Sequence, residues 1–306
     1  MPSRKQEFDR KVRELIAQAK NLRGPARRQV LEMLDAARKR IAGQLAGLDQ
    51  STFSAAQLQQ LKRSIDEAFE FFRRDATAAI QQRQDAAFRL GSVTVDSALD
   101  AAGFPAPALG GVSRNTLSIA QGYTADLVSG LSKKAAADVN GAIQRAFLGG
   151  QSVTEIIQQV ARGLGAPGEV SLWSKLGERA TTIALNEILR VHSISQQARL
   201  EDLRERHPDM QKEWRWVNAG QMPRAPHRDY SGTVVGVDEA FEVAPRYGLP
   251  PERLMYPRDP NGSPENTINC HCLMAPYFAA EDLKPTARHE QILRDLGIRI
   301  EVRRAA

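Results

Sequence analysis

Apolar residues recur every three or four positions through most of the first 207 residues, which is the spacing of one buried face on an α-helix. Breaks at Gly24-Pro25, at the double glycine 149–150 and at residues 165–168 separate these stretches from one another. Each helix would carry a single apolar face, so the helices must pack on each other or on a partner. The pattern predicts helices over about residues 5–22, 26–48, 54–90, 113–147, 152–164 and 172–206.

Capping signals and a breaker segment set the expected helix ends. Ser51 or Ser54 can cap the third helix, and Ser152 with Glu155 forms the reciprocal pattern that starts a helix. Between Gly91 and Val112 the periodicity weakens, and two prolines with several glycines interrupt the backbone hydrogen bonds of a helix. This segment predicts a bend or a hinge.

After Pro208 the apolar spacing changes from the helical period to alternation, which is typical of short strands. The sequence therefore predicts a mainly α protein with a small C-terminal α+β module, in which a short antiparallel sheet carries long loops. Three segments follow from this pattern: a helical N-terminal arm (1–110), a helical middle (111–207) and the α+β module (208–306). The expected strands cover residues 213–217, 233–237, 241–243, 268–274 and 298–302, and a helix at 286–296 precedes the last of them.

Composition is that of an ordinary globular chain. The 306 residues are 42% apolar, which is enough for a sizeable core. There is no run of about 18 apolar residues that would suggest a membrane span. The first residues are charged and lack the apolar centre of a secretory signal, so we expect the protein to stay in the cytoplasm where it is made and to have no membrane partner.

The positive charge is concentrated at the N-terminus. Residues 1–40 hold 12 Lys or Arg against 5 Asp or Glu, a net +7, whereas the whole chain has a net charge of +6. Such an arm could bind nucleic acid or an acidic protein surface, or it could be a solvated amphipathic helix. The candidate contacts are Arg4, Lys5, Arg10, Lys11, Arg27, Arg28, Arg38, Lys39 and Arg40.

The two cysteines, Cys270 and Cys272, lie two positions apart. In an extended strand they would point to one face, with His271 on the other. His227 is a natural third ligand, and the fourth would come from Asp229, Asp259 or His207. Two thiolates, an imidazole and one more ligand suit tetrahedral zinc. The alternative is that both thiols are small buried hydrophobic groups and that His227 ties its loop to the sheet through a hydrogen bond.

The same residues also allow an enzymatic interpretation. A Cys/His nucleophilic pair, or a metal-bound water with Glu265 nearby, would give a hydrolase. No nucleophile elbow, paired-histidine helix, P-loop or dinucleotide fingerprint accompanies them. The segment Asp259-Pro260-Asn261-Gly262 reads first as a turn.

The order of these motifs resembles the phage Mu F-like head morphogenesis proteins, which are also called minor capsid proteins. The resemblance covers roughly residues 135–278 and includes the helical segments AIQRAFLGGQSVTEIIQQV and ERATTIALNEILRVHS. Two positions depart from the family pattern: His271 stands where an arginine is usual, and Leu185-Asn186-Glu187 replaces Arg-Thr-Glu. The matching residues are Trp216, Arg224, His227, Gly232, Pro257, Asp259, Pro260, Glu265, Asn269, Cys270 and Cys272.

The resemblance implies a structural virion component and not an enzyme. A few copies would lie inside the head near the portal, bound to the portal protein or the major capsid protein, and would act in head assembly and in DNA packaging or delivery. The basic N-terminal residues would then contact genomic DNA. A metal-dependent hydrolase or nuclease that uses His227, Asp229, Cys270 and Cys272 is the alternative from another class.

Overall fold

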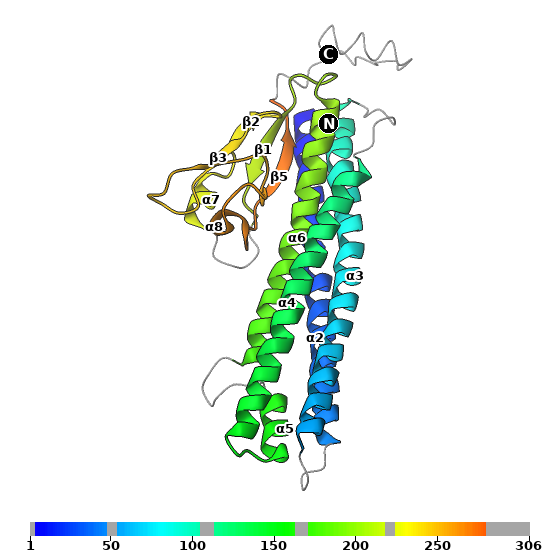
Figure 1. Cartoon of the computed structure of the whole chain (residues 1–306). Coiled ribbons are helices and arrows are strands. Elements are labelled where there is room, and N and C mark those ends of the chain that lie inside the picture. The colour runs from blue at the N-terminus through cyan, green and yellow to red at the C-terminus, as the bar shows by residue number, and fades with distance from the viewer. Residues whose placement is uncertain (1–3, 48–53, 105–112, 163–170, 218–223, 280–306) are drawn as a thin grey trace, which may run out of the picture. The chain divides into compact units, whose positions relative to one another are not determined.

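The computed structural model describes residues 4–47, 54–104, 113–162, 171–217 and 224–279 (Figure 1). It confirms a mainly α protein with a small C-terminal part that contains short antiparallel strands. The predicted helix 286–296 and strand 298–302 lie outside the described residues. The long helices are α1 (Arg4–Asn21), α2 (Arg23–Ala46), α3 (Ala55–Ala102), α4 (Arg114–Leu148), α5 (Val153–Arg162) and α6 (Leu172–Leu203).

Two helices begin with reciprocal caps: the sequence predicted this pattern for Ser152 and Glu155, and for the third helix it predicted a cap by Ser51 or Ser54 without naming its partner. At the start of α3 the backbone N–H of Ser54 donates to Gln57 Oε1 at 2.8 Å, and the N–H of Gln57 donates to Ser54 Oγ at 3.3 Å. At α5 the backbone N–H of Ser152 donates to Glu155 at 2.7 Å, which lowers the pKa of that carboxyl. Both caps satisfy N–H groups that have no partner within the helix.

The expected end of the third helix near Leu90 is wrong, because α3 continues to Ala102 through the first part of the predicted bend or hinge segment 91–112. A Cβ at Gly91 would lie 2.6 Å from the backbone oxygen of His192 and 2.7 Å from Cβ of Ser195. The glycine therefore allows two helices to approach closely and does not break one of them. The helix ends at Gly103, where φ is +83° and the N–H of Phe104 bonds back to Leu99 O at 2.9 Å. The rest of the predicted joint, 105–112, lies outside the described residues.

The strands form two small antiparallel sheets. The first has the order β2-β1-β5, with β1 (Gln211–Arg215) between β2 (Val234–Gly236) and β5 (Leu273–Tyr277). The second pairs β3 (Phe241–Val243) with β4 (Glu252–Leu254). The sequence did not predict β4 or the short helices α7 (Ala225–Asp229) and α8 (Pro264–Thr267).

The chain divides into two compact units. Unit 1 contains residues 1–20, 88–113 and 190–306, and unit 2 contains 21–87 and 114–189. Helices α3 and α6 each contribute residues to both units. The division of the sequence at 110 and 207 stays a prediction.

Helix α1 is not a detached arm, because it packs into the core of unit 1. The ring of Phe8 meets the ring of Phe278 edge-on at 5.8 Å, and Lys5 Nζ donates to the Phe278 backbone oxygen at 3.0 Å. Phe8 and Val12 belong to the same buried cluster as Trp214, which is 0% exposed. Residues from the first turns of the chain thus complete the core around the C-terminal strands.

A buried lysine links β1 to two other parts of unit 1. Lys212 Nζ donates to Gln197 Oε1 at 3.1 Å and to the Met255 backbone oxygen at 2.9 Å, and it lies 5.3 Å from the centre of the Phe241 ring. Burial lowers the pKa of Lys212 to about 8, because the charged form loses its hydration. These contacts fix the register of β1 against α6 and the loop after β4.

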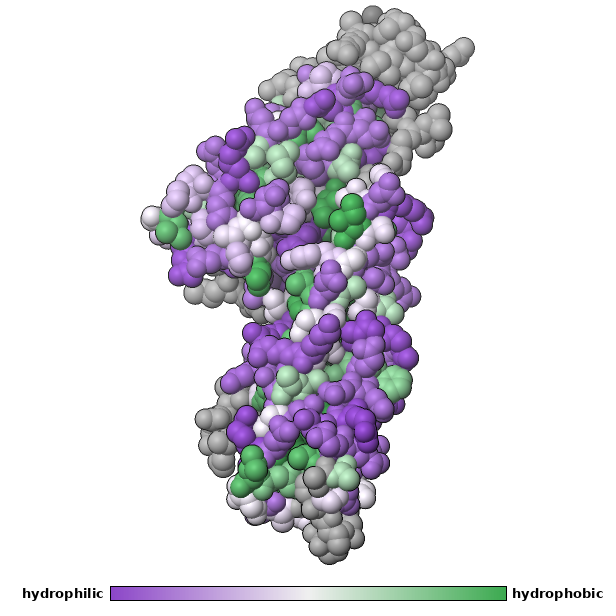
Figure 2. Space-filling model, viewed as in Figure 1, coloured by the Kyte–Doolittle hydropathy of each residue, from purple (hydrophilic) through white to green (hydrophobic). Residues whose placement is uncertain are grey.

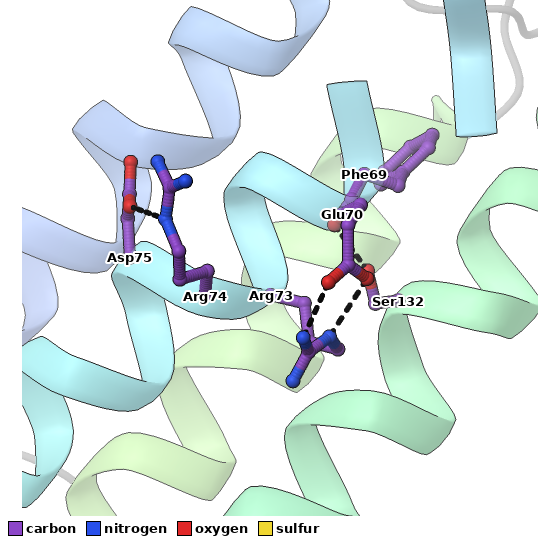
Figure 3. A network of polar contacts seen from close by, with 6 residues as sticks. All are labelled: Phe69, Glu70, Arg73, Arg74, Asp75 and Ser132. Carbon is purple, nitrogen blue, oxygen red and sulfur yellow. Dashed lines mark hydrogen bonds and ion pairs between the residues drawn. The ribbon is translucent and has the colours of Figure 1, made fainter. Parts of the chain in front are cut away.

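Unit 2 is held by apolar contacts and by a few buried hydrogen bonds between helices. The ring of Phe69 stacks on Trp173 at 5.9 Å. Figure 3 shows Ser132 of α4 next to Phe69 of α3, where the Ser132 hydroxyl donates to the Phe69 backbone oxygen at 2.6 Å. In the same view Glu70 accepts from Arg73 Nε at 2.8 Å, and both side chains line a groove that Ser132 of α4 also lines. The small size of Ser132 permits this contact between the two helix backbones.

The surface is largely polar on the face shown in Figure 2, where hydrophobic residues appear as separate spots among hydrophilic ones. None of the described helices is long and apolar enough to cross a membrane. The candidate functional site is therefore sought among the buried polar side chains.

Candidate metal centre

Three side chains that can bind a metal ion lie close together in the loops of unit 1. His227 lies on α7, which starts with a proline in its first turn, and the two cysteines lie on the segment just before β5. Nδ1 of His227 is 3.5 Å from Cys270 Sγ and 3.7 Å from Cys272 Sγ. All three donor atoms lie within 4.8 Å of one another, and the side chains are between 1% and 5% exposed. The structure thus brings together the three residues that the sequence singled out.

Both cysteine sulfurs face His227, but the strand geometry that the sequence predicted is not the reason. The expected strand at 268–274 is wrong, because β5 begins only at Leu273. The segment before it bends instead: Asn269 has a φ of +56°, and the N–H of Cys270 bonds to Thr267 O at 3.4 Å. Alternation along a strand therefore does not explain why both sulfurs face His227.

A buried arginine holds this bent segment. Arg258 is 0% exposed, and its Nη1 donates to the backbone oxygens of Cys270 at 2.7 Å and Cys272 at 2.8 Å. Its own backbone has a φ of +68°, and its carbonyl accepts from Arg190 Nε at 3.0 Å. One guanidinium thereby fixes both cysteine backbones. Positive φ at a residue other than glycine is costly, so the surrounding contacts must maintain this conformation.

Asn266 determines which nitrogen of His227 faces the sulfurs with a lone pair. Its Nδ2 donates to the Val243 backbone oxygen at 2.9 Å and to Glu252 Oε2 at 3.0 Å, so its Oδ1 is left to accept. That oxygen lies 2.6 Å from His227 Nε2, which is therefore the protonated nitrogen. Nδ1 then carries the lone pair and points toward Cys270 and Cys272.

The two thiols do not titrate alike. A hydrogen bond from Cys272 holds the pKa of Cys270 well below its usual range, and the same bond together with burial raises the pKa of Cys272. Arg258 favours the thiolate at both positions. Burial lowers the pKa of the half-buried Arg224, and the cysteine charges oppose that shift. The surroundings therefore favour a thiolate at Cys270 and a protonated thiol at Cys272.

Asp229 and the two other candidate fourth ligands lie elsewhere. Asp229 is exposed and accepts from Tyr247 Oη and from Arg228 Nε, so it does not join the group as the sequence suggested. Asp259 accepts from the N–H groups of Met255 and Asn261, at 2.7 and 2.9 Å, and so stabilises its turn. His207 packs beside Phe104, with ring centres 5.7 Å apart. Among the described residues, no fourth His, Cys, Asp or Glu completes the group.

The other motif residues make hydrogen bonds or ion pairs within the loops of unit 1. Arg224 Nη2 donates to the Ile268 backbone oxygen at 2.5 Å, and Glu265 accepts from Arg246 at 3.1 Å on the surface. The backbone N–H of Trp216 donates to Ser231 Oγ at 2.9 Å, and its indole is partly buried against the core. Neither Glu265 nor Asp229 approaches the sulfurs as a general base would.

Many of the predicted basic contacts are engaged within their own helices. Lys5 pairs with Asp9, Arg10 with Glu7 and Glu14, and Lys11 with Glu14. On α2, Arg38 and Lys39 both pair with Asp35, and Arg40 lies over the ring of Phe71 at 4.1 Å. Arg27 and Arg28 are exposed on the same helix. The N-terminal charge is therefore divided between α1 in unit 1 and α2 in unit 2.

Sequence reasoning missed Arg258 and did not foresee the particular role of Asn266. An arginine between Pro257 and Asp259 in a proline-rich turn is normally a surface residue. Arg258 is buried only because the fold places its turn against the cysteine segment. Asn266 bonds to loop backbone at Val243, and its bond to His227 forms only in the folded loops.

The described residues form a mainly α protein whose small β part carries a buried His/Cys/Cys group. Residues 137–275 match the family model described as phage Mu protein F like protein, which confirms over that segment the resemblance that the motifs predicted. YqbB of Bacillus subtilis strain 168, an uncharacterized protein, is 34% identical over 116 residues. That match spans only about a third of either protein, 37% of this chain and 36% of the relative. No solved structure matches the chain.

Proposed function

We propose that this protein is a minor structural component of a tailed-phage head. The observation that carries the proposal is the match of residues 137–275 to the phage Mu protein F like family. The architecture supports it: the described helices include α3 and α4, of 48 and 35 residues, and the His/Cys/Cys group is too deeply buried to receive a substrate. Partners would be the portal protein or the major capsid protein, and the protein would act inside the head during assembly and in DNA packaging or ejection.

The hydrolase alternative receives less support from the site. A metal-bound water needs a base and an accessible substrate path. Asp229, which that mechanism would use, is paired with Tyr247 and Arg228 on the surface. Glu265 is paired with Arg246 and is exposed.

Mass spectrometry of purified heads from the phage that encodes this chain would test the structural role. We expect the protein in a constant low ratio to the major capsid protein, both in procapsids that lack DNA and in mature heads. A matched lysate fraction without particles serves as the control for free protein. Absence from heads at every stage would refute the proposal.

DNA contact is the finer part of the proposal and requires a different test. Deleting residues 1–40 would remove Phe8 and Val12 from the core of unit 1, so loss of binding would be ambiguous. The double variant Arg27→Gln/Arg28→Gln removes two exposed charges from α2, with Lys133→Gln/Lys134→Gln on α4 as the matched control. Each lost phosphate contact should reduce the slope of log K against log salt by about 0.9. Equal slopes for both variants and the parent would point to a protein partner for this face of α2.

A further inference from the structure

We propose that His227 Nδ1 and the Sγ atoms of Cys270 and Cys272 bind one zinc ion, which joins the loops of unit 1 into a single structural site. The inference rests on the coordinates of three buried side chains and does not depend on a role in the phage head. The ligands come from α7 and from the segment before β5, 43 and 45 positions apart in sequence. A bound ion would therefore connect two parts of the chain that no strand pairing joins directly within the described sheets.

The distances from the imidazole nitrogen to the two sulfurs match those of a tetrahedral zinc site. Zinc lies about 2.3 Å from thiolate sulfur and about 2.0–2.1 Å from imidazole nitrogen, so tetrahedral angles place N and S about 3.6 Å apart. The observed separations from Nδ1 are 3.5 Å to Cys270 and 3.7 Å to Cys272. Two soft sulfurs and one imidazole nitrogen favour zinc over the hard cations magnesium and calcium, which select oxygen.

A hydrogen bond alone accounts less well for this arrangement. The neutral imidazole has one unprotonated nitrogen, and its single lone pair accepts one thiol proton. Because Asn266 binds Nε2, a purely hydrogen-bonded arrangement leaves Nδ1 to one sulfur, and the other thiol bonds its neighbouring sulfur. A cation at the centre would instead use the lone pair and both sulfurs at once.

The parts that surround the donors hold them in place before any ion binds. Arg258 fixes the carbonyls of Cys270 and Cys272 with two hydrogen bonds from one nitrogen. Asn266 fixes the tautomer and the ring plane of His227, and Val243 and Glu252 in turn fix Asn266. Such outer contacts are what orient metal ligands in known sites.

The expected role of the ion is structural. Strands β2, β3 and β4 are only three residues long, so the loops between them contribute little stability of their own. The ligands are 1–5% exposed, which leaves a substrate no access to them.

Zinc content of the full chain, purified without a histidine tag, tests the proposal. After incubation with zinc and desalting, we expect one tightly held zinc ion per chain, measured by plasma mass spectrometry. Cobalt substitution should give the thiolate-to-metal charge-transfer band of a tetrahedral site. Cys270→Ser, Cys272→Ser and His227→Gln should each lose the zinc, whereas the control His271→Gln should keep it. His271 is not part of the donor group although it lies between the cysteines.

Measurements on the unaltered chain test the proposal even if a variant fails to fold. A chelator should lower the melting temperature of the zinc-loaded protein and should speed the reaction of both cysteines with a thiol reagent; added zinc should reverse both effects. The proposal is overturned if the unaltered chain retains no zinc, if the cysteine variants retain as much as the parent, or if chelation changes neither melting nor thiol reactivity.

Discussion

Nε2 of His227 lies 2.6 Å from Oδ1 of Asn266, and the amide of Asn266 is itself held by two acceptors. Asn266 therefore decides how the imidazole presents Nδ1 to the two sulfurs. Replacement of such an outer partner weakens metal binding in known sites about 10- to 100-fold. We expect Asn266→Ala to raise the zinc Kd by that factor, measured by competition with a chelating dye. Asn140→Ala, in unit 2, is the control, and an equal Kd for the two variants would contradict the assigned role.

Gly91 should be intolerant of a side chain, unlike another glycine within a helix. A Cβ at Gly91 would come within 2.6 Å of the His192 backbone oxygen, whereas at Gly130 of α4 it would meet nothing within 4 Å. Gly91→Ala is expected to cost about 1–3 kcal/mol through overpacking. Gly130→Ala should stabilise α4 by about 0.5–1 kcal/mol, because alanine favours the helix. Urea unfolding of both variants measures the difference, and similar midpoints would show that the helices separate at little cost.

Helix α1 should be required for the stability of unit 1. Phe8 is 1% exposed and packs against Phe278, so Phe8→Ala should cost about 3–5 kcal/mol. Leu148→Ala is the control, because that side chain is 88% exposed and its removal should change stability by less than about 0.5 kcal/mol. Tryptophan fluorescence during denaturant unfolding reports the loss through Trp214. Equal unfolding midpoints for the two variants would mean that α1 adds nothing to the core.

The packing of α1 into the core of unit 1 shows that the matched family segment is not a complete core by itself. The matched segment 137–275 excludes α1 and residues 88–104, yet both supply members of the buried cluster around Trp214. The excluded members of the cluster are Phe8, Val12, Val95, Ala98, Leu99, Ala102, Phe104 and Phe278. A fragment limited to the matched segment would lack these residues and would expose the apolar side chains around Trp214 that they cover, so the module depends on flanking segments in this chain.

His192 should make unit 1 sensitive to acid. Burial, with a smaller contribution from Arg258, lowers the pKa of His192 to about 3. The unfolded chain has the ordinary value near 6.5, so it binds the proton first as the pH falls. The stabilising contribution is therefore complete above pH 6.5 and is lost progressively between pH 6.5 and 3. Between pH 7 and 4.5 the loss should be roughly 2–3 kcal/mol.

The variant His192→Leu isolates this effect from the titration of carboxyl groups. Neither ring nitrogen of His192 has a hydrogen-bond partner among the described residues, so an apolar side chain should be tolerated. The difference in unfolding free energy between parent and variant should shrink or reverse in favour of the variant as the pH is lowered. Parallel pH curves for the two proteins would exclude the assigned protonation state.

Local physical chemistry explains where prediction from the sequence succeeded. Helix periodicity and the reciprocal cap of Ser152 with Glu155 depend on residues a few positions apart, so they can be recognised without the fold, as can a capping serine before the third helix. The segment Phe241–Val243 was predicted with its observed bounds because turn residues flank it. The end of α3 was misplaced because the reason for Gly91 lies on α6, about a hundred positions away.

By itself the sequence determined the helical class, the small C-terminal sheets, the Mu F-like resemblance and the grouping of His227 with Cys270 and Cys272. Only the tertiary structure decided that Asp229 lies outside that group, that Arg258 holds the cysteine backbone and that α1 belongs to the core around Trp214. The reason is physical. Periodicity, capping and donor chemistry are properties of neighbouring residues, whereas burial, tautomer choice and close helix approach arise from contacts between segments far apart in the chain.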